Sequence, residues 1–256
     1  MFKIATWNLN SLKVRHDHVL DWLASEQPDV LALQETKTQD QNFPLEAINN
    51  AGYQVSFAGQ KTFNGVATLS KISGQDVVTD LPDFEDPQRR VMGCRIGDVF
   101  VLNLYVPNGS EVGSEKYAYK LNWLKALNVY VTHLLEKERH VILLGDFNIA
   151  PEDRDVHDPE KWKDGVLVSE PEREALIKIQ DEGLVDVFRL FDQEEKSFSW
   201  WDYRMLGFQQ NNGLRIDLIL ASQKLSEFCT SCRIDKEPRR LEKPSDHTPV
   251  IAEFNL

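Results

Sequence analysis

The chain has 256 residues, a net charge of −12 and a hydrophobic fraction of 41%. No apolar run reaches the length of about eighteen residues that a membrane span needs, and the N-terminus lacks a signal-peptide pattern, so we expect a cytoplasmic protein. The acidic balance favours a small anionic substrate over a polyanion, unless positive charge gathers on one face. With three cysteines a disulfide framework is not expected. Cys229 and Cys232 have C-x-x-C spacing, but a zinc site would want a second pair, so we expect a strand there whose alternate residues face the core.

Strand and helix patterns alternate along the chain. The first helix is predicted over 12–26, the second over 115–138 and the third over 170–182, where Ser169 and Glu172 form a capping box and Gly183 ends the helix. Gly97 and Asp98 predict a hairpin between two of the strands. Apolar runs typical of strands cover 3–8, 29–35, 54–59, 65–70, 91–96, 99–106, 140–146, 184–189, 215–221 and 249–254.

These elements indicate a mixed α/β fold rather than a purely parallel sheet. About ten strands fit two mixed β-sheets packed face to face with helices outside. No linker rich in Gly, Ser or Pro is present, so we expect a single domain over residues 1–256. The polar stretch 151–168 is predicted to be a long loop, and such loops are often functional.

Four acids occur where apolar strands end or turn. They are Glu35, Asp146, Asp217 and Asp246. Each alone suggests a salt bridge or a helix cap, but four acids brought together would repel one another without a shared cation. Oxygen ligands suit Mg²⁺, with Mn²⁺ as the alternative, and one or two ions would fit.

His247 is the one histidine that adjoins a candidate metal ligand. Paired with Asp217, it would form an imidazolium able to bind phosphoryl oxygen. Asp146 is a candidate base, and Asn148 lies two residues later to hold water or phosphate. The pattern predicts attack by water on a phosphate ester, helped by a metal that neutralises oxygen charge.

These residues resemble the endonuclease/exonuclease/phosphatase superfamily, and within it the exonuclease III family of DNA-repair nucleases. The resemblance implies a four-layered α/β sandwich whose site lies at one edge between the sheets. The segments that carry it cover nearly the whole chain: Trp7-Asn8, Gln34-Glu35-Thr36-Lys37, Tyr105-Val106-Pro107-Asn108-Gly109, Gly145-Asp146-Phe147-Asn148, Trp200-Trp201-Asp202-Tyr203-Arg204, Arg215-Ile216-Asp217 and Ser245-Asp246-His247.

The resemblance also implies roles for individual residues. Catalysis is assigned to Asp146, Asn148, Asp217, His247 and Tyr105. The predicted metal ligands are Glu35, Asn8, Asp146, Asn148, Asp246 and His247. Asn108 and Lys37 are expected near phosphate, and local basic residues add Arg90, Lys116, Arg204 and Arg239 as candidate DNA contacts. Trp200, Leu214 and Ile216 match an apolar pocket for a flipped-out abasic sugar, although core packing is the competing interpretation.

The predicted activities are 3′–5′ exonuclease, 3′-phosphatase and abasic-site endonuclease, in base excision repair. The expected partner is double-stranded DNA with abasic sites, nicks or blocked 3′ ends, bound by a monomer and with no membrane involved. A specialised 3′-end enzyme is an alternative, because His157 in the 151–168 loop could crowd an extrahelical sugar. A phosphoesterase acting on a small molecule is a second alternative, and a non-catalytic interaction module is a third.

Overall fold

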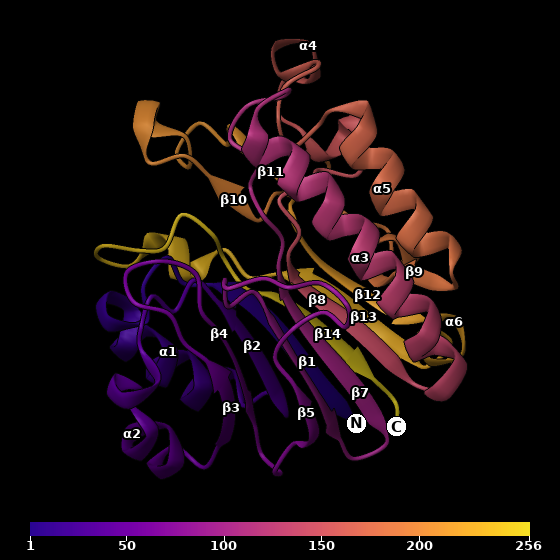
Figure 1. Cartoon of the computed structure of the whole chain (residues 1–256). Helices are drawn as coiled ribbons and strands as arrows, with labels where there is room; N and C mark the ends of the chain where they lie inside the picture. The colour runs from indigo at the N-terminus through magenta and orange to yellow at the C-terminus, as the bar shows by residue number, and fades with distance from the viewer.

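The computed structural model describes residues 1–256 and contains two six-stranded sheets (Figure 1). In spatial order, the first sheet consists of β13 (Cys229–Ile234), β14 (Val250–Phe254), β1 (Phe2–Asn8), β2 (Val30–Gln34), β4 (Val66–Ser70) and β3 (Gln54–Ala58). The second consists of β5 (Gln75–Val78), β6 (Val91–Ile96), β7 (Val99–Tyr105), β8 (Val141–Asp146), β12 (Asp217–Ser222) and β9 (Leu184–Asp186). A short pair, β10 (Trp200–Trp201) and β11 (Gly213–Leu214), stands apart from both.

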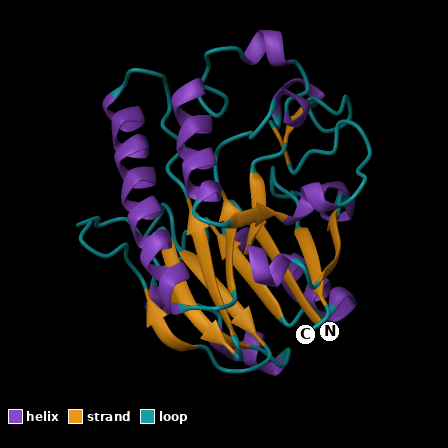
Figure 2. Ribbon diagram, turned by 90° about the vertical axis from the view of Figure 1, so that its right-hand side faces the viewer, coloured by secondary structure: helices purple, strands orange, loops and turns teal.

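Helices cover the outer faces of the two sheets, as Figures 1 and 2 show. The first sheet is covered by α1 (Leu12–Glu26) and α2 (Leu45–Asn50), and the second by α3 (Glu115–Lys137) and α5 (Glu170–Asp181). The short helix α4 (Pro159–Trp162) stands away from the sheets at the top of Figure 1, and the short helix α6 (Gln223–Ser226) follows β12. Alternate strand residues separate into two cores: Ile142 and Leu144 pack between the sheets, whereas Leu143 packs toward α3 and α5. A third core joins the first sheet to α1 and α2. The predicted four-layered sandwich is therefore confirmed.

The predicted elements recur with small shifts. All three predicted helices are found within one residue of their expected ends, and the hairpin turns at Gly97 and Asp98. The predicted strand 184–189 ends early, because the Asp186 side chain accepts a bond from Phe188 N (3.1 Å) and starts a 3₁₀ turn. The strand predicted over 215–221 begins only at Asp217. None of the helices combines the length and apolar character needed to cross a membrane.

The stretch 151–168 is more structured than a plain loop. It contains a 3₁₀ turn at Asp153–Asp155 and the short helix α4. Asp155 ties this stretch to the rest of the protein. Its carboxylate forms ion pairs with buried Arg215 (2.7 Å) and with Arg189. Arg215 in turn reaches Asp186 (2.8 Å). The segment is thus held against β9 and β12 by a buried ion-pair network rather than by apolar contacts alone.

A buried amide links the two sheets close to the end of β2. Asn103 on β7 donates from Nδ2 to the carbonyl oxygens of Leu33 (3.2 Å) and Ala67 (2.9 Å) in the first sheet. Its Oδ1 accepts a bond from Nε2 of Gln34 (2.7 Å). Because buried polar groups need partners, these bonds fix how one sheet sits on the other.

We predict that Asn103→Ala lowers the free energy of unfolding by about 2–4 kcal/mol, because buried polar groups of the facing sheet lose their partner. Urea unfolding followed by circular dichroism measures this. Asn49→Ala, at an exposed position of α2, is the control and should change stability by less than about 0.5 kcal/mol. Equal effects of the two substitutions would contradict a linking role for Asn103.

Candidate active site

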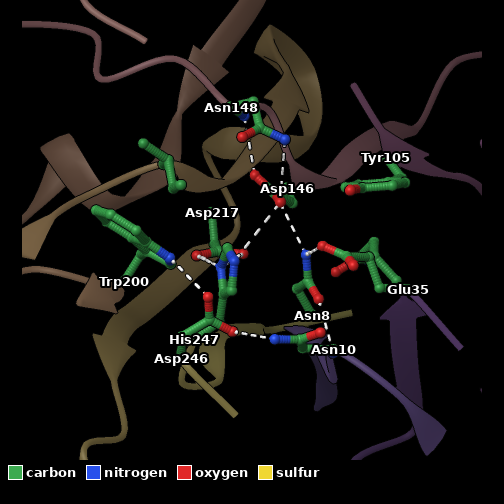
Figure 3. A network of polar contacts seen from close by, with 12 residues as sticks. Asn8, Asn10, Glu35, Tyr105, Asp146, Asn148, Trp200, Asp217, Asp246 and His247 are labelled. Carbon is green, nitrogen blue, oxygen red and sulfur yellow. Dashed lines mark hydrogen bonds and ion pairs between the residues drawn. The ribbon is translucent and has the colours of Figure 1, made fainter. Parts of the chain in front are cut away.

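Two buried carboxylates face each other across the β8–β12 pair. Asp146 lies directly opposite Asp217 in the antiparallel register, and each is at most 1% exposed. The imidazole of His247, which comes from the segment before β14, lies between them (Figure 3). Its Nδ1 donates to Oδ2 of Asp217 (2.9 Å), and its Nε2 faces Oδ2 of Asp146 at 3.7 Å. The predicted pairing of Asp217 with His247 is present in the structure.

The charges of this group depend on one another. Burial alone would lower the pKa of His247, but the carboxylates of Asp217, Asp146 and Asp246 raise it to about 10. Burial raises the pKa of Asp146 to about 7, with Asp217 and Glu35 adding to the rise and His247 opposing it. An imidazolium is therefore the counter-charge that allows two carboxylates to share this buried space.

Asn8 connects this group to Glu35. At the end of β1, its Nδ2 donates to Oε1 of Glu35 (3.0 Å) and Oδ2 of Asp146 (2.8 Å). Glu35 follows β2 and has a left-handed backbone with φ of 48°. Its other carboxylate oxygen pairs with Nζ of Lys37 (2.8 Å). The neutral amide of Asn8 thus bridges the carboxylates of Glu35 and Asp146, which stand at the ends of strands in different sheets.

Asn10 is a site residue that the sequence reasoning missed. Its Nδ2 donates to Oδ1 of Asp246 (3.0 Å), and its Oδ1 accepts from Lys37 Nζ (2.6 Å). Asp246 also accepts a bond from Trp200 Nε1 (3.0 Å). Burial opposes ionisation of Asp246, but His247 and these bonds hold its pKa below the usual value. The sequence feature that could have identified Asn10 as a site residue is its position two residues after Asn8.

Asn148, Asn108 and Tyr105 form the opposite wall. Asn148 follows β8 with a φ of 49°, and its Nδ2 donates to Oδ2 of Asp146 (3.2 Å) and to Val106 O (3.0 Å). Its Oδ1 accepts from Asn108 Nδ2 (3.0 Å). Tyr105 pairs with Asp146 in the parallel register of β7 and β8. Burial, with Glu35 and Asp146 nearby, raises the pKa of Tyr105 well above its usual value, so it stays a phenol.

The predicted basic contacts occupy very different environments. Arg90 and Arg239 are largely buried: Arg90 stacks on the Tyr105 ring (4.6 Å) with its donors on Gln88 and Tyr105 O, and Arg239 donates to Ser245 O (2.7 Å). Both guanidinium groups thus bond to or stack on neighbouring residues of the site. Lys116 is exposed near the start of α3, and Arg204 is exposed but pairs with Asp202 (2.7 Å).

The three residues predicted to line an abasic pocket lie in or against one apolar cluster. Leu214 and Ile216 are fully buried in a small apolar cluster under the 151–168 segment, and Trp200 is only partly exposed. Trp162 of α4 packs edge-on against Trp200 at 6.3 Å. His157 donates to Gly213 O (3.2 Å) and packs edge-on against Trp162. Trp162 therefore contacts both His157 and Trp200.

The donor set fits a hard divalent cation. Glu35, Asp146 and Asp246 offer carboxylate oxygens, and no cysteine lies among the residues of the site. Candidate ligand atoms of Asp146, Asp217 and His247 lie within 4.8 Å of one another. However, both ring nitrogens of His247 face carboxylates.

Comparison with known proteins agrees with this geometry. A model of the Endonuclease/Exonuclease/phosphatase family matches residues 5–247. The chain belongs to this family. It is 38% identical to exodeoxyribonuclease III of Haemophilus influenzae over 265 aligned residues, which cover 98% of this chain and 99% of that protein.

Two solved structures superpose on the entire chain. One is a 3′ phosphatase from Neisseria bound to a product DNA hairpin, with 43% identity and a TM-score of 0.98. The other is an AP endonuclease from Archaeoglobus fulgidus, with 39% identity and a TM-score of 0.96. In both cases all of each chain is covered. The predicted DNA-repair nuclease of the exonuclease III type, a metal-dependent phosphoric-ester hydrolase, is thereby confirmed.

We predict that Asp217→Asn and His247→Gln each lower kcat by about a thousandfold, and that the double variant is no worse than the poorer single one. The reason is that Asp217 acts only through the imidazolium it holds. Turnover on a nicked duplex measures the effect, with Asp98→Asn in the exposed hairpin as control. Losses that multiply in the double variant would show that the two residues act independently.

Proposed function

We propose that this protein is a Mg²⁺-dependent phosphoesterase of base excision repair that acts on double-stranded DNA as a single-domain monomer. Its substrates are duplexes with nicks, blocked 3′ ends or abasic sites. The reactions are removal of 3′ nucleotides, removal of 3′ phosphates and cleavage beside an abasic sugar. All three are hydrolyses of a phosphate ester and need the same central groups.

The observation that carries this proposal is the arrangement of Asp146, Asp217 and His247. An imidazolium between two carboxylates presents Nε2 toward the same space as Asp146 Oδ2, at a separation of 3.7 Å. A phosphoryl oxygen needs a cationic donor, and an attacking water needs an acceptor. One cluster offers both, beside the oxygen-rich group of Glu35, Asn8 and Asp246.

Each residue then has a defined task. Water attacks phosphorus as the bond from phosphorus to the leaving oxygen breaks, and that oxygen takes up a proton from solvent. Asp146 Oδ2 accepts a proton from the attacking water, and Asn148 orients that water or a phosphate oxygen. His247 Nε2 donates to a non-bridging oxygen as negative charge develops there, while Asp217 keeps Nδ1 protonated. Glu35, Asn8 and Asp246 would hold the metal ion, which when bound neutralises charge on the phosphate. Asn108 and Tyr105 border the phosphate from the β7 side.

Two hollows with exposed cations support a polyanionic substrate despite the net charge of −12. One, of about 810 Å³, is lined by Lys13, Lys37 and Lys61. Because Lys37 pairs with Glu35, this hollow adjoins the acids. The other, of about 760 Å³, contains Lys236 and Arg240 and reaches Pro244, next to the Ser245-Asp246-His247 segment. Cationic surfaces on either side of a phosphate site suit a nucleic-acid strand.

A specialised 3′-end enzyme is the second candidate. Leu214 and Ile216 are 0% and 1% exposed, and Trp162 packs against the Trp200 ring. An extrahelical sugar would need this apolar cluster to open, whereas a 3′ phosphate at a nick would not. The 43% identity to a 3′ phosphatase is consistent with this alternative.

The proposed function is tested by incubating the protein with three duplexes, with and without Mg²⁺. They carry a 3′ phosphate at a nick, an unblocked nick and an internal abasic site. Mg²⁺-dependent hydrolysis of at least one is expected. Turnover of a small phosphate ester with no reaction on DNA would instead favour a small-molecule phosphoesterase.

We predict that Glu35→Gln weakens Mg²⁺ binding and lowers kcat at limiting Mg²⁺ by at least about a hundredfold. The fold should be retained, because removing one acid relieves repulsion in the metal-free protein. Isothermal titration with Mg²⁺ and an activity titration measure the two effects. Glu46→Gln, at the start of α2 and away from the site, is the control. Near-normal activity of Glu35→Gln at low Mg²⁺ would exclude Glu35 as a ligand.

We further predict that Trp200→Ala and His157→Gly change the ratio of abasic-site cleavage to 3′-phosphate release. Trp200→Ala removes a wall of the pocket, and His157→Gly removes a support of Trp162. The ratio should shift in both variants, toward abasic-site cleavage in His157→Gly, while Glu35→Gln lowers both rates together. Rates on the two duplexes measure the ratio. An unchanged ratio in both variants would remove pocket and segment from substrate selection.

A further inference from the structure

Lys120 is a fully buried cation behind the active site. It lies on α3, and its side chain is 0% exposed. Its ammonium group donates to Asn108 O (3.1 Å), to Asn148 O (2.6 Å) and to the carboxylate of Glu172. An ammonium has three protons, so all of them are used. Lys120 has no part in the proposed hydrolysis.

Both carbonyl groups belong to residues whose side chains reach the site. Asn108 and Asn148 bond to each other through their amides, and Asn148 also bonds to Asp146. Asn148 has a φ of 49°, a left-handed conformation that is uncommon for residues with a side chain, although Asn adopts it more readily than most. Holding both carbonyl groups from one point restrains the direction of both amides.

Glu172 extends the same contact to the end of the 151–168 segment. Its carboxylate accepts bonds from Leu167 N (3.0 Å), Ser169 N (3.2 Å) and the Ser169 hydroxyl. Tyr117, one turn before Lys120 on α3, contacts Ser169 Oγ (2.6 Å). Two helices, two site loops and the segment that carries Trp162 therefore meet at one buried ion pair.

Stability alone gives a weak reason for such a pair. Two charges moved out of water lose hydration, and apolar residues of similar volume often replace a buried pair without loss of stability. An apolar side chain, however, cannot donate to two carbonyl groups. The bonds to Asn108 and Asn148 are what Lys120 supplies and a methionine would not.

We propose that Lys120 is a positioning residue that aims the amides of Asn108 and Asn148 at the phosphate ester. This rests on the proposed function, since the amides matter only if a phosphate binds beside Asp146. Lys120 itself touches no substrate. Its loss should misplace two hydrogen-bonding groups, and small misplacements in an active site lower turnover by up to about a hundredfold.

The test compares the full-length protein with Lys120→Met, Glu172→Gln and the double variant Lys120→Met/Glu172→Gln. Release of phosphate from a nicked duplex with a 3′ phosphate is measured in Mg²⁺, at a temperature where circular dichroism shows each protein folded. Lys125→Met, at an exposed position of α3, is the matched control. Ser169→Ala removes one bond to Glu172 but none of the three bonds that Lys120 donates, so it reports lost stability with those three bonds kept.

We expect Lys120→Met and the double variant to lose about 10- to 100-fold in kcat with KM within about threefold. The double variant should melt at a higher temperature than Lys120→Met, because no unpaired carboxylate remains buried. Glu172→Gln and Ser169→Ala should melt lower than wild type but keep kcat within about threefold. A kcat that simply follows the melting temperature through the series would overturn the proposal.

Hydrogen exchange gives a readout that does not depend on the proposed activity. In the double variant, peptides covering 104–110 and 145–152 should exchange faster, while peptides of β1 and β2 keep their protection. Unchanged exchange in those two peptides would overturn the positioning role. Failure of the wild type on every DNA substrate would overturn the proposed function instead. The exchange result would still show whether Lys120 holds the loops of Asn108 and Asn148 in place.

Discussion

The contact on which the rest of the site depends is the imidazolium of His247 between Asp146 and Asp217. The two carboxylates are opposite each other on adjacent strands of the second sheet, and neither is open to water. Placed there alone, they would repel strongly in a medium of low polarity. The compensating positive charge is that of His247, which lies in the segment that leads into β14 of the first sheet. The charge balance of the site therefore depends on how the first sheet is placed against the second.

Neutral amides carry out much of the remaining organisation. Asn8 joins Glu35 to Asp146, Asn10 joins Asp246 to Lys37, and Asn103 with Gln34 links the sheets beneath. An amide satisfies a buried carboxylate without cancelling its charge. The site consequently keeps a local excess of negative charge that suits a cation, while its hydrogen bonds are largely satisfied. This arrangement explains how acids from several strand ends coexist in one place.

The cations of this acidic chain are divided between interior and surface. Arg15, Arg90, Lys120, Arg215 and Arg239 are buried and bind carbonyl groups, carboxylates or aromatic rings. Each of them holds a loop that borders the site. The exposed cations Lys13, Lys61 and Arg240 line the two hollows beside the site. Such local groups of cations make a net charge of −12 compatible with a polyanionic substrate.

The sequence by itself determined the class of fold and the chemical core of the site. Period-two and helical apolar patterns depend on local geometry, so strands such as 141–146 and helices such as 12–26 were predictable, as were Glu35, Asp146 and Asp217 at strand ends. Only the tertiary structure showed that Arg90 and Arg239 are buried, that Trp162 packs against the cluster of Leu214 and Ile216, that Asn10 bonds to Asp246, and that Lys120 bonds to two loops of the site. A charged or apolar residue has the same letter whether it faces solvent or a neighbour. Its role is decided by contacts between segments far apart in the chain, which no local pattern encodes.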